Sequence, residues 1–273
     1  NSAQMHNGRI EVKVLVAGLL DNQTGIDPGD IFYLSTTAGA ITTTIMGQGG
    51  PTVRIASGES AGTSLIGFTV EGGTGEPIGT ETYGGGIYCN NASLALVDCI
   101  LRENSAHYGA GLYAEGTSSV ITGCQFSMNS AVAHGGGLMS VLGALHLSES
   151  DFIQNTTSLY YHGGGGAFID TPGALVNDCL FSGNQAGHGN SAYSEGGGVA
   201  SIDPTAQFTL CVFDGNRAQD GYGGGLWGAG NLDECSFLSN QALEGGGVYG
   251  SGGLFATGCH FESNVAAPYP WQG

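Results

Sequence analysis

Cysteine is the residue whose spacing first suggests chemistry in this sequence. The chain has seven cysteines, and six of them stand in copies of one short motif, Cys-x-Phe-x-x-Asn. Thiolates could hold a metal ion, and thiols could pair as disulfides. The sequence has no Cys-x-x-Cys and no His-x-x-x-His, and thiols that point in parallel from successive repeats do not match disulfide geometry. We therefore expect buried free thiols that fill space as small apolar groups, with a metal site as the alternative.

The motif belongs to a longer repeating unit of 22–32 residues, which reads Gly-Gly-Gly-apolar, a short strand, then Cys-x-Phe-x-x-Asn. Ser150 replaces one Cys and Leu101 replaces one Phe. A fixed period of this length indicates a repeat architecture. The repeated positions are Cys99, Cys124, Cys179, Cys211, Cys235 and Cys259; Phe126, Phe152, Phe181, Phe213, Phe237 and Phe261; and Asn104, Asn129, Asn155, Asn184, Asn216, Asn240 and Asn264.

These units must be strands that stack on one another. Residues two apart in a strand face the same way, so the Cys and Phe of each copy should point together into the core. A unit this short cannot bury its apolar face alone, so successive units must stack on one another in a solenoid. Stacked strands lie ~4.8 Å apart, so the Asn side chains should hydrogen-bond along the axis, as stacked amides do in cross-β assemblies. The sequence predicts an all-β solenoid of about 8–10 rungs.

Two features lie outside this pattern. The segment 65–73, "LIGFTVEGG", is a weaker early copy, in which we align Phe68 with the Phe position and Glu71 with the Asn position. Cys89 directly follows the "GGGIY" segment, and we expect it to face inward on its own strand.

The paired "GGG-apolar" and "FxxN" signals over 84–264 resemble the GGA[ILV] and FxxN repeats of chlamydial-type polymorphic outer-membrane proteins. Those proteins fall within the pectate-lyase-like superfamily. The resemblance implies a right-handed, single-stranded parallel β-helix. This sequence has Gly where Ala is usual, and no C-terminal membrane barrel, so the resemblance does not extend to the autotransporter export route.

We divide the chain into an N-terminal strand or cap segment (1–30), the parallel β-helix (31–264) and a C-terminal tail (265–273). A solenoid must cap its terminal rungs, or their open edges pair with other chains. The segment 9–20 is strand-like and could cap the first rung or pair with a neighbouring subunit. The last rung lacks an amphipathic cap, so we expect it to associate head to tail with another copy. The candidate assembly residues are Ile10, Val12, Val14, Val16, Tyr269 and Trp271.

The segment between each Asn and the next glycine triplet is, in this interpretation, the only part of the unit that varies in length. Insertions of this kind leave a solenoid along one edge, which is often the binding face. Tyrosines, histidines and acids gather there, and such side chains can line a sugar-binding groove, cover an exposed turn, or take part in catalysis. The candidate ligand or partner residues are Tyr83, Tyr108, His134, His162, Glu195, Tyr222 and Glu244.

Charge and motif content weigh against several functions. The formal net charge is −18, with five Lys and Arg residues, and nucleic acid and anionic membrane are bound through Lys and Arg. No apolar run is long enough to span a membrane. Arg54, Arg102 and Arg217 are isolated, and no G-x-S-x-G or phosphate-loop motif occurs. We expect no cofactor and no catalytic residues.

The sequence therefore favours a secreted or cell-surface solenoid with a structural or adhesive role. Its predicted partners are other copies of itself, joined head to tail in a filament, or a surface glycan or protein. The alternative is a carbohydrate-active β-helix, either a polysaccharide lyase or hydrolase or a sugar-binding module, that uses the edge carrying the insertions.

Overall fold

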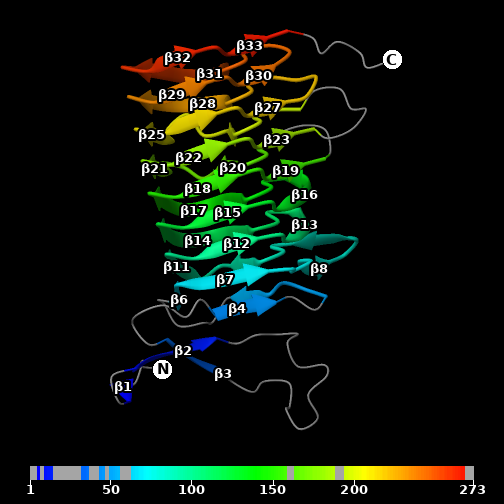
Figure 1. Cartoon of the computed structure of the whole chain (residues 1–273), viewed down its shortest axis with the longest axis vertical. Helices are drawn as coiled ribbons and strands as arrows, with labels where there is room; N and C mark the ends of the chain where they lie inside the picture. Colours follow the sequence, from blue (N-terminus) through cyan, green and yellow to red (C-terminus); the bar gives the residue numbers. More distant parts are fainter. Residues whose placement is uncertain are drawn as a thin grey trace.

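The computed structural model describes residues 49–55, 63–158, 163–187 and 194–267, together with strands at 5–6, 9–14, 32–36 and 43–46. Every regular element of this part of the chain is a strand. Successive rungs stack along one axis, and the colours run from cyan through green and yellow to red from one rung to the next (Figure 1). The predicted all-β parallel solenoid is confirmed.

Three sheets run along the axis. Sheet I follows the glycine triplets, sheet II carries the Phe positions, and sheet III follows the Asn positions. The strands of sheet I are β5 (Val53–Ile55), β6 (Thr63–Ile66), β10 (Ile87–Asn90), β11 (Ser93–Val97), β14 (Leu112–Thr122), β17 (Leu138–Ser148), β20 (Ala167–Asp170), β21 (Leu175–Asn177), β24 (Val199–Ser201), β25 (Gln207–Thr209), β28 (Leu226–Asp233) and β31 (Val248–Thr257).

Sheets II and III have nine strands each. Sheet II comprises β4 (Thr43–Met46), β7 (Phe68–Glu71), β12 (Ile100–Arg102), β15 (Gln125–Ser127), β18 (Asp151–Ile153), β22 (Leu180–Ser182), β26 (Val212–Asp214), β29 (Ser236–Leu238) and β32 (His260–Glu262). Sheet III comprises β8 (Glu76–Ile78), β9 (Glu81–Tyr83), β13 (Ser105–Tyr108), β16 (Ser130–His134), β19 (Thr156–Thr157), β23 (Gln185–Ala186), β27 (Arg217–Ala218), β30 (Gln241–Ala242) and β33 (Val265–Ala266). Sheet II contributes one strand to each rung of the solenoid.

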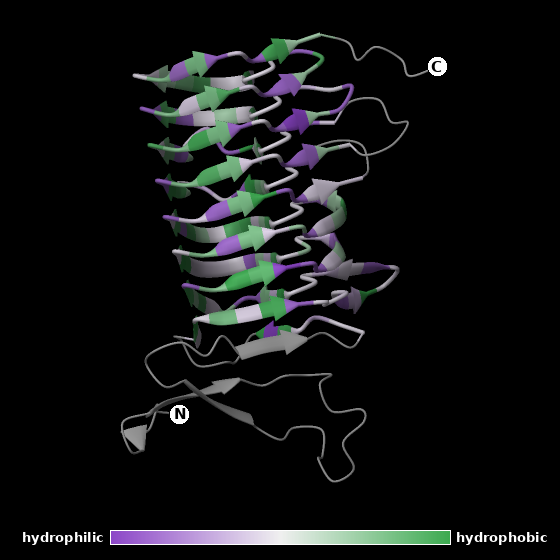
Figure 2. Cartoon of the chain, viewed as in Figure 1, coloured by the Kyte–Doolittle hydropathy of each residue, from purple (hydrophilic) through white to green (hydrophobic). Residues whose placement is uncertain are grey.

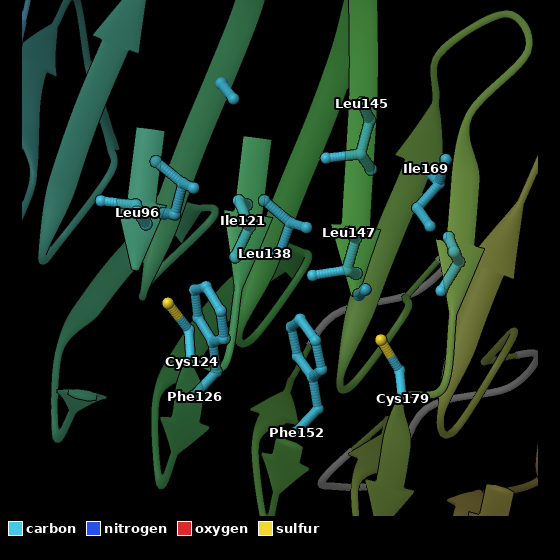
Figure 3. Close-up of a cluster of buried hydrophobic side chains, with 14 of the residues drawn as sticks. Leu96, Ile121, Cys124, Phe126, Leu138, Leu145, Leu147, Phe152, Ile169 and Cys179 are labelled. Atoms are coloured by element: carbon cyan, nitrogen blue, oxygen red, sulfur yellow. The ribbon is translucent and has the colours of Figure 1, made fainter. Parts of the chain in front are cut away.

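The core is built from the repeated positions. The fully buried Phe126 and Phe152 rings stack with centroids 4.6 Å apart, and the stack continues through Phe181, Phe213 and Phe237 to Phe261. Figure 3 shows two of these rings beside Cys124 and Cys179, facing aliphatic side chains of sheet I. Hydrophobic and hydrophilic residues lie next to each other within many strands (Figure 2), because successive residues of a strand face opposite sides of the sheet.

The asparagines form a continuous amide ladder from Asn104 to Asn264. In each step the backbone N–H and Nδ2 of one Asn donate to Oδ1 of the next, as from Asn155 to Asn184 at 2.9 and 3.0 Å. Nδ2 of Asn184 also donates to the Phe152 carbonyl at 2.8 Å. The ladder therefore satisfies buried polar groups that would otherwise be costly to bury.

The seven cysteines are free thiols, and all except the half-buried Cys259 are buried. Each Sγ in the column faces backbone carbonyls, as Cys235 does with Phe208 and Asp233. Contact with the Cys99 thiol and then burial raise the pKa of Cys124, and burial raises the pKa of Cys89 to about 12. Because the thiolate is the reactive form, a raised pKa keeps Cys89 and Cys124 as thiols, which pack as small apolar groups.

The glycine triplets are required where neighbouring rungs touch. Gly196 has φ +64°, a left-handed conformation that favours glycine. A Cβ on Gly197 would lie 2.4 Å from the Gly224 carbonyl oxygen of the next rung, and one on Gly198 would lie 2.5 Å from that of Gly225. The turn therefore closes only with no side chain at these positions.

The early copy of the motif was aligned wrongly. Leu101 pairs with Val70 and Arg102 with Glu71, so Val70 occupies the Phe position, Phe68 lies one place before the Thr69–Ile100 pair, in the Cys column, and Gly73 stands in the Asn column. Gly73 N–H accordingly donates to Oδ1 of Asn104 at 3.0 Å. The predicted alignment of this copy was wrong because any large apolar residue can fill either inward position.

Two further expectations need correction. Phe32–Thr36 (β3), which we assigned to the β-helix, pairs antiparallel with β2 (Arg9–Val14), which also pairs with β1 (Met5–His6). Length also varies in a second place, since Gly225 lies 10 residues before Cys235 whereas Gly198 lies 13 before Cys211. Where this shorter unit pairs with the following rung, β28 against β31, the register shifts between Gly228 and Gly230.

Candidate functional site

A column of mostly aromatic side chains covers the outside of sheet I. The first residue after each triplet points inward, so the second points outward. Strand pairing places these second residues in register along the whole solenoid. This outer ladder consists of Tyr88, Tyr113, Met139, Phe168, Ala200, Trp227 and Tyr249. All but Tyr249 are less than 10% exposed.

A second column lies across the glycine corner, formed by the residue immediately before each triplet. Tyr108 pairs with Tyr83 and with His134, and Tyr222 pairs with Glu195 and Glu244. Six of the seven predicted edge residues therefore occupy this one edge column. The corresponding position in the fourth repeat is Gly163, and the predicted His162 lies outside the described residues.

The two columns pack against each other. The Tyr83 ring meets Tyr113 edge-on with centroids 5.0 Å apart, His134 stacks on Phe168 at 4.9 Å, and Tyr222 contacts Tyr249 at 4.7 Å. The glycine corner brings both columns together because it has no side chains to separate them. The predicted edge is thus half of a larger aromatic corner, and its other half is the outer ladder.

Ring orientation limits what this corner can bind. Tyr83 stacks on Tyr108 at 4.9 Å and 19°, and Tyr88 stacks on Tyr113 at 5.8 Å and 5°. Flat stacking along the axis uses the ring faces within the protein, and Tyr88 and Tyr113 are each only 6% exposed. The aromatic corner therefore stabilises neighbouring rungs, and a ligand would meet phenol groups and carboxylates rather than open rings.

Carboxylates concentrate where the β8–β9 hairpin joins the corner. This antiparallel pair, Glu76–Ile78 with Glu81–Tyr83, departs from the parallel pairing of the later rungs. Glu81 accepts hydrogen bonds from the Tyr83 and Tyr108 hydroxyls at 2.9 and 3.3 Å. Glu115 accepts one from the Tyr113 hydroxyl at 3.1 Å. Burial, followed by the Glu81 carboxylate, raises the pKa of Tyr83 to about 12, which keeps this phenol a proton donor.

Two arginines have acid partners that the sequence did not reveal. Arg54 Nε lies 3.1 Å from Glu76, and the guanidinium also lies 5.8 Å from the Tyr88 ring centre. Arg102 Nε lies 2.6 Å from Glu71. The prediction that these two arginines are isolated was wrong, because their partners are distant in sequence; Glu71, for example, pairs with Arg102 from the neighbouring rung.

A family model for the right-handed β-helix region matches residues 84–266. The chain belongs to the right-handed β-helix family. The resemblance to this fold is confirmed, and the pectate-lyase-like superfamily is consistent with it; the more specific likeness to polymorphic outer-membrane repeats stays a prediction. No match to the chain was found among curated proteins or solved structures.

The predicted assembly residues of this β-helix are only partly placed. Ile10, Val12 and Val14 belong to strand β2, whose partners are β1 and β3 of the same chain. Val16, Tyr269 and Trp271 lie outside the described residues. In the last described rung, Phe255, Phe261 and Val265 are 68%, 51% and 46% exposed.

Within the described ranges, no group of three or more His, Cys, Asp or Glu residues could hold a metal ion. These ranges also contain no helix long and apolar enough to cross a membrane.

Sequence reasoning missed two columns of this β-helix. The outer ladder was visible as the last residue of each "GGGIY"-type segment, where alternation alone puts it outside. An inward column of small residues also occurs two places after each Asn, and an alignment of the repeats would have shown it. Its members are Ala106, Ala131, Thr157, Ala186, Ala218, Ala242 and Ala266.

Thr157 is the exception in that small-residue column, and replacing it should stabilise the protein. Its hydroxyl is buried with no hydrogen-bond partner. Thr157→Val keeps the shape of the side chain and removes the hydroxyl that has no partner. We therefore expect the free energy of unfolding to rise by about 1–2 kcal/mol. Urea denaturation checks this, with Thr156→Val as a control that should not stabilise. A lower stability for Thr157→Val would contradict the assignment.

Proposed function

We propose that this β-helix is an extracellular or cell-surface structural rod with an adhesive role, and that copies join end to end. The observation that carries the proposal is the continuity of its ladders. Stacked Phe rings, amides and outer aromatic side chains each link one rung to the next, so every contact stiffens the axis.

The exposed side chains of the last described rung support end-to-end joining. The Phe261 ring ends a stack in which Phe152, Phe181, Phe213 and Phe237 each contact two neighbouring rings, and Phe261 is 51% exposed. A rung from a second copy would supply a ring there and a strand for each of the three sheets. An open sheet edge is a ready template for such pairing, and a head-to-tail contact of this kind extends into a filament.

Electron microscopy of the purified protein tests the end-to-end contact. We expect the native chain to form filaments several monomers long, and Phe261→Asp to give single short rods because a charge replaces the contact ring. Leu142→Asp is the matched control, since Leu142 is 59% exposed on the flank of the solenoid. Single rods for the native chain, or filaments from Phe261→Asp, would contradict self-association.

A carbohydrate-binding role is the second candidate, favoured by the hairpin side of the aromatic corner. Glu81 accepts hydrogen bonds from two phenols and can accept more, because a carboxylate has about four lone-pair sites. Sugar hydroxyls could donate to it and to Glu115.

Binding to insoluble polysaccharides tests this second role. If it is correct, Glu81→Gln should weaken binding about tenfold or more, the usual cost of losing a hydrogen bond to a charged group. Asp214→Asn on sheet II, away from the corner, should leave binding unchanged. No binding by the native chain, or equal loss in both variants, would count against it.

A further inference from the structure

Two N-glycosylation sequons in the described residues have opposite surroundings. Asn91-Ala92-Ser93 lies at the turn between β10 and β11, and Asn155-Thr156-Thr157 lies in the amide ladder. The sequence Asn-x-Ser/Thr is the acceptor that oligosaccharyl transfer recognises. Both sites are accessible in an unfolded chain, but only one remains so in the β-helix.

Asn155 has no room for a glycan in the folded protein. Its side chain is 0% exposed. Both hydrogens of its Nδ2 are used, one toward the Phe126 carbonyl at 2.8 Å and one toward Oδ1 of Asn184 at 3.0 Å. Its Oδ1 in turn accepts from Asn129 at 2.9 Å. A glycan on Nδ2 would remove one of these donors and put bulky polar sugar between adjacent rungs.

Asn91 is arranged quite differently. It is exposed, adopts φ 51° at the turn, and its Nδ2 donates to Oδ1 of the neighbouring Asn90 at 2.6 Å. One hydrogen of the Asn91 amide remains for substitution, and a sugar there extends into solvent. The same modification is therefore compatible with the rung at Asn91.

We propose that Asn155 is an N-glycan acceptor in the unfolded chain and that a glycan there blocks formation of the β-helix, whereas a glycan at Asn91 does not. In the transfer, Nδ2 bonds to the anomeric carbon of an oligosaccharide carried on a polyprenyl diphosphate. The bond from that carbon to the diphosphate oxygen breaks, the diphosphate leaves, and Nδ2 loses one proton. The β-helix can therefore form only if the chain folds before Asn155 receives a glycan, or in a compartment without this transfer reaction.

The experiment uses the full chain behind a cleavable signal peptide, translated in the presence of endoplasmic-reticulum microsomes. The sequence has a third sequon, Asn22-Gln23-Thr24, which Thr24→Ala removes in both variants. The variant Thr24→Ala with Ser93→Ala keeps only the Asn155 sequon. The variant Thr24→Ala with Thr157→Val keeps only the Asn91 sequon and leaves the ladder asparagine in place. Endoglycosidase-sensitive gel mobility identifies the glycosylated molecules, and limited digestion with thermolysin reports whether each form has folded.

Glycosylated molecules that carry only the Asn155 sequon should be digested as fast as the urea-unfolded chain, while their unglycosylated counterparts resist. Both forms of the Asn91 variant should resist equally. The proposal is overturned if the Asn155 glycoform resists digestion, if Asn155 is never modified, or if a glycan at Asn91 also abolishes resistance. None of these outcomes depends on whether the rod is adhesive or filamentous.

Discussion

Phe213→Asp should leave the protein unable to form its β-helix. Phe213 is fully buried in the middle of the ring stack, 5.0 Å from Phe181 and 4.6 Å from Phe237. Truncating a buried Phe alone costs about 3–5 kcal/mol. A carboxylate at this position adds the cost of burying a charge with no partner. Since whole domains are stable by only about 5–15 kcal/mol, the sum is expected to exceed what the fold can lose.

Circular dichroism and thermolysin digestion measure this outcome, and Phe213→Leu is the matched control. Leucine keeps an apolar side chain at the site, and Leu101 occupies the same column in its own rung, so the control should fold with reduced stability. A normally stable Phe213→Asp protein would disprove the inward position of the Phe column.

Asn184→Ala should have the next largest effect, because it interrupts the amide ladder. The Asn184 Oδ1 accepts two hydrogen bonds from Asn155, and its Nδ2 donates to the Phe152 carbonyl and to Asn216. Each buried polar group left without a partner costs about 1–3 kcal/mol. We expect a loss of roughly 3–5 kcal/mol in the free energy of unfolding, from several stranded groups in adjacent rungs.

The neighbouring Gln185→Ala provides the control for that measurement. Gln185 is half-buried, and its side chain donates to Gln219 at 3.2 Å on the outer surface. Urea denaturation should show less than about 1 kcal/mol for this change, as for a partly exposed hydrogen bond. Equal losses for both variants would mean that the ladder contributes no more than ordinary surface contacts.

The aromatic corner links neighbouring rungs, and in our proposal it is also the adhesive surface. Its rings stack on one another and its phenols donate to Glu81 and Glu115. The hairpin at β8–β9 is where this pattern changes, and it is the first place to look for a ligand.

The ladders could be predicted because each depends on residues at fixed offsets within one unit. Spacing of two puts Cys and Phe on one face, and stacking then repeats that face. The same alternation puts the outer ladder on the opposite face, as the second residue after each glycine triplet. The prediction failed for 65–73, where Phe68 and Val70 are both apolar and either could take the ring position.

The sequence by itself determined the solenoid, its inward columns and the edge on which insertions leave, because a repeat must present the same groups to each neighbour. Only the tertiary structure decided which residues meet across rungs and across the glycine corner. Arg102 meets Glu71 and Tyr83 meets Tyr113 from about 30 residues away, through stacking that no single unit encodes. Burial likewise separated Asn155 from Asn91, which as sequons look the same.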